Sequence, residues 1–428
     1  MAGSTVYGVR HLRFCLIGGA NPCHNPRLVR EADALVRAGY QVRVVAIGTM
    51  REHADSDARL LASRAWQLQR VDLFPDGQGR RLRLHWMRAR RRLAEHAFRY
   101  AGSATFAEYS CCACLPELTA FACAEPADWF IAHAQPALPV AAAAAKRWNA
   151  RLGFDCEDLL AETDGNSDAI RLVEQRYLPQ CEYISAASYA MAERLVERHD
   201  VTRPVVLYNV FPSSLADGLS PPNARPRHSR LRLHWFSQTL GTDRGLQDVF
   251  EACSGLADQV EIHLRGHGPG TQAEKAVLSL AEQNGLRSTV KLHPLIHHDQ
   301  VIASMGDYDV GLALERSDHP NYSRTVTNKV FSYLLAGLAI AATDTLGQRE
   351  IMSQIPAAGA LYPTGNSRGL RQILEHWLTH PEQLRQAQRA AWDAARQKFC
   401  WDLECAKFLR LLGKGTGDLV ASAVSVPA

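Results

Sequence analysis

Long apolar runs are absent from this 428-residue sequence. No stretch approaches the ~20 consecutive apolar residues that a membrane-spanning helix needs, and the alanine-rich run from Ala137 to Ala145 is too short. The opening residues are basic and apolar, but they lead into a strand-like pattern without a cleavage site of small residues, so no secretion signal is expected. These features predict a cytoplasmic protein.

Motifs of several enzyme classes are lacking as well. The 11 cysteines are an odd set without regular spacing, which indicates reduced thiols and not a disulfide framework. Cys111, Cys112 and Cys114 have no second ligand pair at zinc-finger spacing, so they are expected to be buried thiols. Walker-type loops, G-x-S-x-G elbows and HExxH helices do not occur. No metal ion is expected.

Lysine is scarce and arginine abundant, with seven lysines among the 48 basic residues. The net charge of +4 gives no reason to expect a nucleic-acid partner. Arginines concentrate at 80–99, where eight of them are interleaved with apolar residues. Such a stretch can lie on an anionic membrane surface, which would make the protein peripheral on the inner face of the membrane. The alternative is a solvated helix face in an arginine-rich protein.

The chain opens with the pattern of a strand, a helix and a second strand. Residues 11–19 and 41–48 have strand patterns. The helix between them is expected to be capped by Asn25, to have Pro26 at its first position and to end just before Gly39.

Strand and helix patterns continue to alternate in two series, separated by a proline- and glycine-rich stretch. Apolar strands joined through helices form parallel sheets, so the predicted fold is α/β with two Rossmann-like lobes. The predicted boundaries are an N-terminal domain at 1–212, a linker at 213–229, a C-terminal domain at 230–395, a final helix at 396–413 and a disordered tail at 414–428.

The segment TNKVFSYLLAGLAIAATD predicts a helix, a glycine stop and a buried strand. Thr327 or Asn328 can cap this helix, whose free backbone N–H groups would bind an anion. Lys329 adds positive charge at a helix N-terminus, where a cation is unfavourable unless an anion is present. The segment therefore predicts a phosphate site. A lysine that only solvates the helix end is the alternative.

Other loops that follow strands supply further candidates, because ligands bind beyond the carboxyl ends of parallel strands. Gln238 and Thr239 follow one strand, and Arg244 begins the next helix as a second cation for the same phosphates. The glycines of RGHGPG (265–270) would let a ligand approach the backbone, as would Gly18 and Gly19 in the first lobe.

Three candidate catalytic residues stand at predicted strand ends. His133 and Asp155 belong to the first lobe and Glu315 to the second. Such side chains could take a proton or stabilise developing positive charge. The alternatives are a hydrogen-bonded strand-end histidine and carboxylates that cap the following helices.

Five stretches, in this order and spacing, resemble the GT-B glycosyltransferases, most closely the GT4-like, nucleotide-sugar-dependent branch. They are NPRLVREADALVRAGYQVRVVA, CEYISAASYAMAERL with VVLYNVFP, TLGTDRGLQDVFEAC, IHLRGHGPG, and YDVGLALE followed by TNKVFSYLLAGLAIAATD. The resemblance covers nearly the whole chain.

The resemblance implies that the N-terminal lobe binds the acceptor and the C-terminal lobe the nucleotide sugar, with the last helix crossing back to the first lobe. Arg244 and Lys329 would bind the donor diphosphate, His293 would lie against the base, and His133 would stand near the transferred sugar. The donor would be a UDP-, GDP- or dTDP-sugar, and no other cofactor is expected. The remaining implied donor-binding residues are Gly18, Gly19, Gln238, Thr239, Gly266, His267, Gly268, Thr327, Asn328 and Ser332.

The sequence departs from the family at two places. Many relatives carry two glutamates around this helix, where Arg324 and Ser332 stand here, and Glu315 could supply the lost carboxylate. Gln238 or Thr239 replaces the first cation of the usual diphosphate pair.

The resemblance implies sugar transfer, with retention and without a metal ion, to a glycan, lipid-linked or small-molecule acceptor. If the enzyme inverted configuration, Asp155, Asp158 or His133 would have to accept the proton. A sugar-nucleotide epimerase and a weakly catalytic nucleotide-sugar-binding module are the alternative functions.

Overall fold

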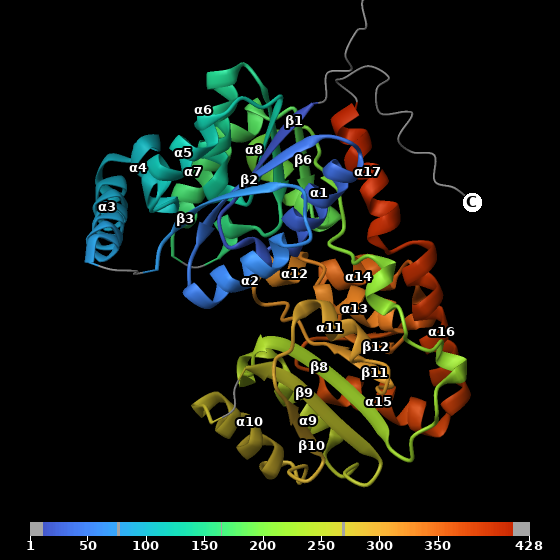
Figure 1. Ribbon diagram of the computed structural model, residues 1–428. Helices are drawn as coiled ribbons and strands as arrows, with labels where there is room; N and C mark the ends of the chain where they lie inside the picture. Colours follow the sequence, from blue (N-terminus) through green and yellow to red (C-terminus); the bar gives the residue numbers. More distant parts are fainter. Residues whose placement is uncertain (1–11, 75–77, 164, 268–269, 414–428) are drawn as a thin grey trace, which may run out of the picture. The chain divides into compact units, whose positions relative to one another are not determined.

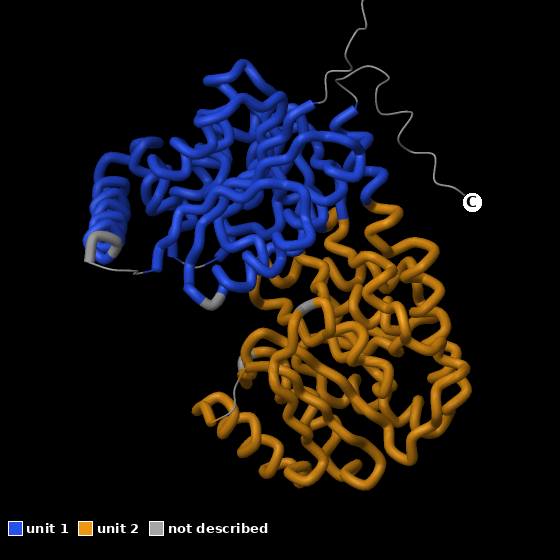
Figure 2. Tube along the Cα trace, in the orientation of Figure 1, with its two compact units in different colours: residues 1–187, 191–207, 405–428 blue, residues 188–190, 208–404 orange. Residues whose placement is uncertain are grey.

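A computed structural model describes residues 12–74, 78–163, 165–267 and 270–413. The chain divides by its contacts into two units. Unit 1 comprises residues 1–187, 191–207 and 405–428, and unit 2 comprises residues 188–190 and 208–404 (Figure 2).

Unit 1 contains a seven-stranded parallel sheet in the order β3-β2-β1-β4-β5-β6-β7 (Figure 1). All its strands except the edge strands β3 and β7 are largely buried, as expected for a sheet covered on both faces. The register places Gly18, His133, Asp155 and Ser185 side by side at the carboxyl ends of adjacent strands. The strands are β1 (Arg13–Gly18), β2 (Gln41–Gly48), β3 (Gln67–Asp72), β4 (Trp129–His133), β5 (Arg151–Cys156), β6 (Tyr183–Ala186) and β7 (Val205–Val206).

The helices that lie wholly or mostly in unit 1 are α1 (Pro26–Arg37), α2 (Arg51–Leu61), α3 (Gln78–Ala101), α4 (Ala104–Cys111), α5 (Leu115–Ala124), α6 (Leu138–Trp148), α7 (Ser167–Tyr177), α8 (Tyr189–His199) and α17 (Trp401–Gly413). The predicted start of α1 is confirmed, because the Asn25 side chain accepts a hydrogen bond from the backbone N–H of Leu28. Gly39 follows the helix with a φ of +85°.

Unit 2 contains a six-stranded parallel sheet in the order β10-β9-β8-β11-β12-β13. The prediction of two parallel sheets is therefore confirmed. The strands are β8 (Leu231–Thr239), β9 (Val260–His267), β10 (Val290–His293), β11 (Val310–Ala313), β12 (Ala339–Thr343) and β13 (Gly359–Tyr362). The helices are α9 (Leu246–Cys253), α10 (Gln272–Gln283), α11 (His298–Ala303), α12 (Pro320–Arg324), α13 (Asn328–Ala336), α14 (Leu346–Met352), α15 (Ser367–Thr379) and α16 (Pro381–Gln397).

The faces of the unit 2 sheet are closed by different helices. Leu233, Leu264 and Leu312 pack with buried residues of α9, α10 and α15. On α13, Tyr333 donates a hydrogen bond to the backbone carbonyl of Leu312 at 3.0 Å. Its ring occupies the space that a side chain at Gly311 would need. This packing holds the start of α13 at a fixed place beside β11.

The segment predicted as a linker, 213–229, packs on unit 2. Arg225 donates a hydrogen bond to the backbone carbonyl of Ala336 at 2.6 Å, and its guanidinium lies 5.7 Å from the ring centre of Trp392. The contacts divide the units between Leu207 and Tyr208, five residues before the predicted end of the first domain. The predicted final helix begins at Trp401, and the predicted tail, 414–428, lies outside the described residues.

Candidate functional site

The residues of the predicted phosphate site come together where β11 ends and α13 begins. Thr327 caps α13, and its side chain accepts from the backbone N–H of Lys329. The Nζ of Lys329 lies 2.6 Å from Oε1 of Glu315, which follows β11. The exposed fractions of these side chains are 12% and 18%, so the pair is largely shielded from water. Glu315, Lys329 and the backbone N–H groups at the start of α13 therefore lie at the same place.

Glu315 is held in its charged form. Burial alone would raise its pKa, but the charge of Lys329, hydrogen bonds from Lys329 and Thr327, and the charge of Arg244 together lower it. The backbone carbonyl of Glu315 also accepts a hydrogen bond from Thr343 on β12 at 2.5 Å. The cluster therefore contains two cations and one carboxylate, a net positive charge.

Gly245 brings Arg244 to this cluster. It has a φ of +80°, and a Cβ on it would lie 2.8 Å from the backbone oxygen of Leu314. Only glycine combines this conformation with such a close approach. The loop between β8 and α9 can therefore lie directly against the end of β11.

The carboxyl ends of β8 and β9 also approach each other closely. β8 has an irregular register between Phe236 and Thr239, and Thr239 is then paired with His267 of β9. A Cβ on Gly266 would lie 3.1 Å from the backbone oxygen of Ser237, so this glycine allows the two strands to approach. Gln238, Thr239 and His267 are exposed, and Gly268 lies outside the described residues.

His293 belongs to a chain of hydrogen-bonded side chains that was not predicted from the sequence. Its Nε2 lies 2.9 Å from Nδ1 of His263, and Nε2 of His263 lies 3.4 Å from Glu261. Burial lowers the pKa of His263 to about 4, and burial and the charge of Arg265 lower that of His293. Both rings are therefore neutral. Glu261 and His263 could have been noticed as alternate residues of β9, which point to the same face of the sheet.

These contacts determine the tautomers of the two rings. His263 donates from Nε2 to Glu261, so its Nδ1 accepts from Nε2 of His293. The Nδ1 of His293, at the end of β10, is then a lone-pair acceptor. A ligand beside it would be recognised through an N–H or O–H donor.

Ser332 is placed differently from what the resemblance implied. It is buried in α13, and its hydroxyl donates to the backbone carbonyl of Asn328 at 2.9 Å. This hydrogen bond within the helix turns the hydroxyl away from an external ligand.

The candidate catalytic residues of unit 1 lie in a buried ionic cluster, in which only Glu157 is partly exposed. His133 lies 3.3 Å from Glu31 and 3.0 Å from Glu157. Arg27 donates to both carboxylate oxygens of Asp155. Arg27 and Glu31 were not predicted from the sequence, although charges at inward positions of the amphipathic α1 could have indicated a buried pair.

His133 is positively charged in this cluster. Burial by itself would lower its pKa, but the carboxylates of Glu31, Glu157 and Asp155 outweigh burial and raise it to about 10. A protonated imidazole cannot accept a proton, and the carboxylate of Asp155 is occupied by Arg27. The geometry therefore favours positioning roles for both residues over the predicted catalytic ones.

The same cluster has the spacing of a metal site without its chemistry. Ligand atoms of Glu31, His133 and Asp155 all lie within 4.8 Å of one another. The guanidinium of Arg27 already neutralises Asp155, and the imidazolium of His133 faces Glu31. A divalent cation would have to displace two positive groups, so the cluster does not fit a metal ion.

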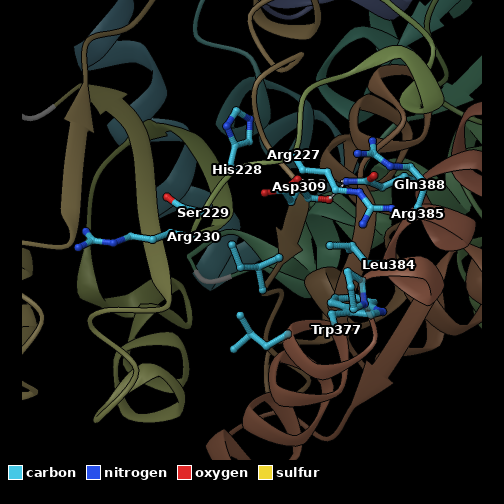
Figure 3. Close-up of a pocket in the computed structure, with 12 residues that line it drawn as sticks. Arg227, His228, Ser229, Arg230, Asp309, Trp377, Leu384, Arg385 and Gln388 are labelled. Atoms are coloured by element: carbon cyan, nitrogen blue, oxygen red, sulfur yellow. Dashed lines mark hydrogen bonds between the residues drawn. The ribbon is translucent and has the colours of Figure 1, made fainter.

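A separate cavity of about 150 Å³ lies at the amino ends of the unit 2 strands, away from the candidate site at their carboxyl ends (Figure 3). Leu231 and Asp309, which line it, stand at the amino ends of β8 and β11. None of the predicted donor-binding residues lines it. Its other polar lining residues include Arg227, Arg230, Arg385 and Gln388.

Comparison with known proteins identifies the architecture. No protein-family model and no curated protein matches the sequence. Among solved structures, HepE of Anabaena in complex with UDP and glucose superposes with a TM-score of 0.69 over 94% of this chain and 100% of that chain, at 15% identity. The chain has the GT-B fold.

Two further GT-B comparisons agree. Sucrose-phosphate synthase of Thermosynechococcus elongatus matches with a TM-score of 0.66 and 13% identity over 94% of this chain and 99% of that one. A glycosyltransferase of Rickettsia africae matches with a TM-score of 0.66 and 12% identity over 96% and 100%. The fold predicted from the resemblance is confirmed. Among the described residues, no helix is both long and apolar enough to cross a membrane.

Proposed function

We propose that this chain is a glycosyltransferase that uses a nucleotide-sugar donor. The observation that carries the proposal is the position of Lys329 at the capped start of α13. It lies beside Glu315, whose pKa is lowered by the charges of both Lys329 and Arg244. Two cations and a helix N-terminus at the carboxyl end of a parallel sheet form a diphosphate site. HepE, which shares the fold, was crystallised with UDP.

Donor cleavage would place negative charge on the diphosphate and positive charge on the sugar ring. Lys329, Arg244 and the backbone N–H groups at the start of α13 would stabilise the leaving diphosphate without a metal ion. Glu315 would hold Lys329 in place, and its negative charge would stabilise the positive charge that develops on the sugar ring. Transfer with retention is proposed, in which the leaving phosphate accepts the acceptor's proton.

The other loops would complete the donor site. Gln238, Thr239, Gly266 and His267 would line the path of the phosphates, and the lone pair on Nδ1 of His293 would accept an N–H of the base. Unit 1 is proposed to bind the acceptor, a glycan, a lipid-linked sugar or a small molecule. There the charged cluster of Arg27, His133 and Asp155 would fix the loop after β1, with Gly18 and Gly19 approached by substrate.

Binding of UDP, GDP and dTDP, followed by calorimetry, tests the diphosphate site. Lys329→Ala is expected to weaken binding of the preferred nucleotide about 10- to 100-fold, because a charge-assisted hydrogen bond is lost. Turnover of the matching nucleotide sugar should fall ~10²–10³-fold, as on loss of one preorganised donor. Lys146→Ala is the matched control, since this exposed lysine lies in the last turn of α6 in unit 1.

Wild-type affinity and turnover in folded Lys329→Ala protein would refute the proposed site. Failure of all three nucleotides to bind would refute the nucleotide-sugar proposal itself. Conversion of the donor sugar in the absence of any acceptor, followed by NMR, would instead identify an epimerase. Binding without release of a nucleoside diphosphate would identify a binding module.

A further inference from the structure

Helix α3 (Gln78–Ala101) carries two apolar stripes, and only one of them is covered. Leu84, Met87 and Ala94 form the covered stripe and are buried, and α3 packs against α4 in unit 1. Arg90 anchors this side, because its guanidinium lies 2.7 Å from Glu117. The burial of this stripe fixes which face of α3 is turned outward.

The second stripe is exposed along the helix. Leu82, Trp86, Leu93 and Tyr100 keep 72%, 61%, 65% and 81% of their surface exposed. With the exposed Ala89 and His96 they follow one another at intervals of four and three residues. At 3.6 residues per turn, side chains with this spacing lie within about 40° of one line. Large apolar side chains on a single narrow line are a surface feature that requires a partner.

Arginines flank this stripe. At about 100° from it on one side lie Arg81, Arg88, Arg92 and Arg99, and on the other side lies Arg83. All five are exposed, and among the described residues no ion pair is recorded for any of them. The whole helix has eight arginines and one acidic residue, Glu95, which already pairs with Arg91. The outward face of α3 is thus apolar at its centre and strongly basic at its edges.

We propose that α3 is a docking surface for an anionic lipid bilayer. Leucine side chains of the exposed stripe would enter the boundary of the acyl chains, and Trp86 and Tyr100 would lie at the level of the headgroups, where amphipathic rings are favoured. The flanking arginines would reach lipid phosphates. Each basic residue near an anionic surface strengthens attachment about fivefold, so the charge and the apolar stripe act together.

The charge pattern argues against a second copy of this chain as the partner. Two α3 helices joined through the exposed stripe would bring their flanking arginines together, and like charges repel. Coiled-coil interfaces instead place charges of opposite sign beside the apolar seam. α3 offers only Glu95 for such pairing, and Arg91 occupies it. An anionic bilayer supplies the missing counter-charge.

Sedimentation of the full chain with lipid vesicles tests this proposal, and it requires no enzymatic activity. Vesicles of phosphatidylcholine are compared with vesicles containing about 30% phosphatidylserine, at about 0.05 M and about 0.5 M salt. Binding is expected only to the anionic vesicles and should weaken at high salt. Leu82→Ser/Leu93→Ser should reduce binding about tenfold per leucine.

The matched control is Leu346→Ser/Leu403→Ser, which removes two leucines that are 48% and 45% exposed on α14 and α17. It should bind vesicles as the wild type does, and circular dichroism should show both variants folded. Equal loss in both variants, or no binding by the wild type, would overturn the proposal. So would a lipid-free dimer in sedimentation velocity that Leu82→Ser/Leu93→Ser abolishes, because a second copy would then cover the stripe.

Discussion

The chemistry of single residues in this protein is set by buried charge pairs. Lys329 pairs with Glu315 in unit 2, and Arg27 pairs with Asp155 in unit 1. Removing one partner of a buried pair leaves an uncompensated charge and costs about 3–5 kcal/mol, whereas an exposed pair contributes little. Substitutions at these positions therefore need a folding control before a loss of activity is interpreted.

His133 should make the stability of unit 1 depend on pH. Its pKa is about 10 in the folded protein against 6.5 as the ordinary value, so its contribution is complete below pH 6.5 and is lost as pH rises towards 10. The raised pKa of Glu31 acts in the same direction. We expect His133→Asn to be less stable than the wild type near pH 7 but to lose less further stability between pH 7 and about 9.5.

Urea unfolding across this pH range measures the effect. His85→Asn is the control, because His85 is exposed on α3. An unchanged slope in His133→Asn would mean that His133 is not protonated in the folded protein, and the catalytic role predicted from the sequence would then regain support.

At the scale of elements, the candidate donor site depends on how loops approach strand ends. Gly245 lets the loop after β8 contact Leu314, and Thr343 of β12 holds the carbonyl of Glu315. α13 starts beside them because Tyr333 is packed against Gly311. Each of these contacts joins two elements, so a small backbone change in one of them should reach the nucleotide.

Gly245→Ala should therefore weaken nucleotide binding as well as stability. An L-residue in the left-handed region costs about 1–3 kcal/mol, and here the Cβ would also clash with the backbone oxygen of Leu314. Gly285→Ala is the matched control, because its φ is +73° but nothing lies within 4 Å of the added Cβ. We expect both variants to unfold at lower urea concentrations and only Gly245→Ala to bind the preferred nucleotide more weakly. Equal affinities in the two variants would show that the Arg244 loop is not part of the site.

At the scale of the whole molecule, each unit has its own parallel sheet, so a ligand that binds unit 2 should stabilise unit 2 directly. At a concentration of 100 times its dissociation constant, a nucleotide adds about 2.7 kcal/mol to the stability of the state that binds it. Amide hydrogen exchange measured with the preferred nucleoside diphosphate should slow at 237–246 and 314–330. The sheet of unit 1 should be little affected.

Lys329→Ala provides the control for this experiment, since it should lose the protection at the same nucleotide concentration. Protection limited to 227–231 and 381–388 would place the nucleotide in the cavity at the amino edge of the sheet instead. That outcome would contradict the proposed donor site without affecting the proposal for α3.

The sequence by itself determined the two parallel sheets, the start of α1 at Asn25 and Pro26, and the place of Lys329 in the first turn of a capped helix. Strand burial, helix caps and glycine stops are properties of neighbouring residues, so they can be read from local patterns. The Thr327 cap and the position of Lys329 beside it were predictable for the same reason.

Only the tertiary structure decided which distant side chains meet. Glu315 and Lys329 are 14 residues apart, His263 and His293 are 30 apart, and Arg27 and Asp155 are 128 apart. Strand register and helix packing bring them together, and neither is encoded in a short segment. Burial then changes their roles: His133 becomes a cation among carboxylates, and the exposed stripe of α3 becomes visible only once its other stripe is covered.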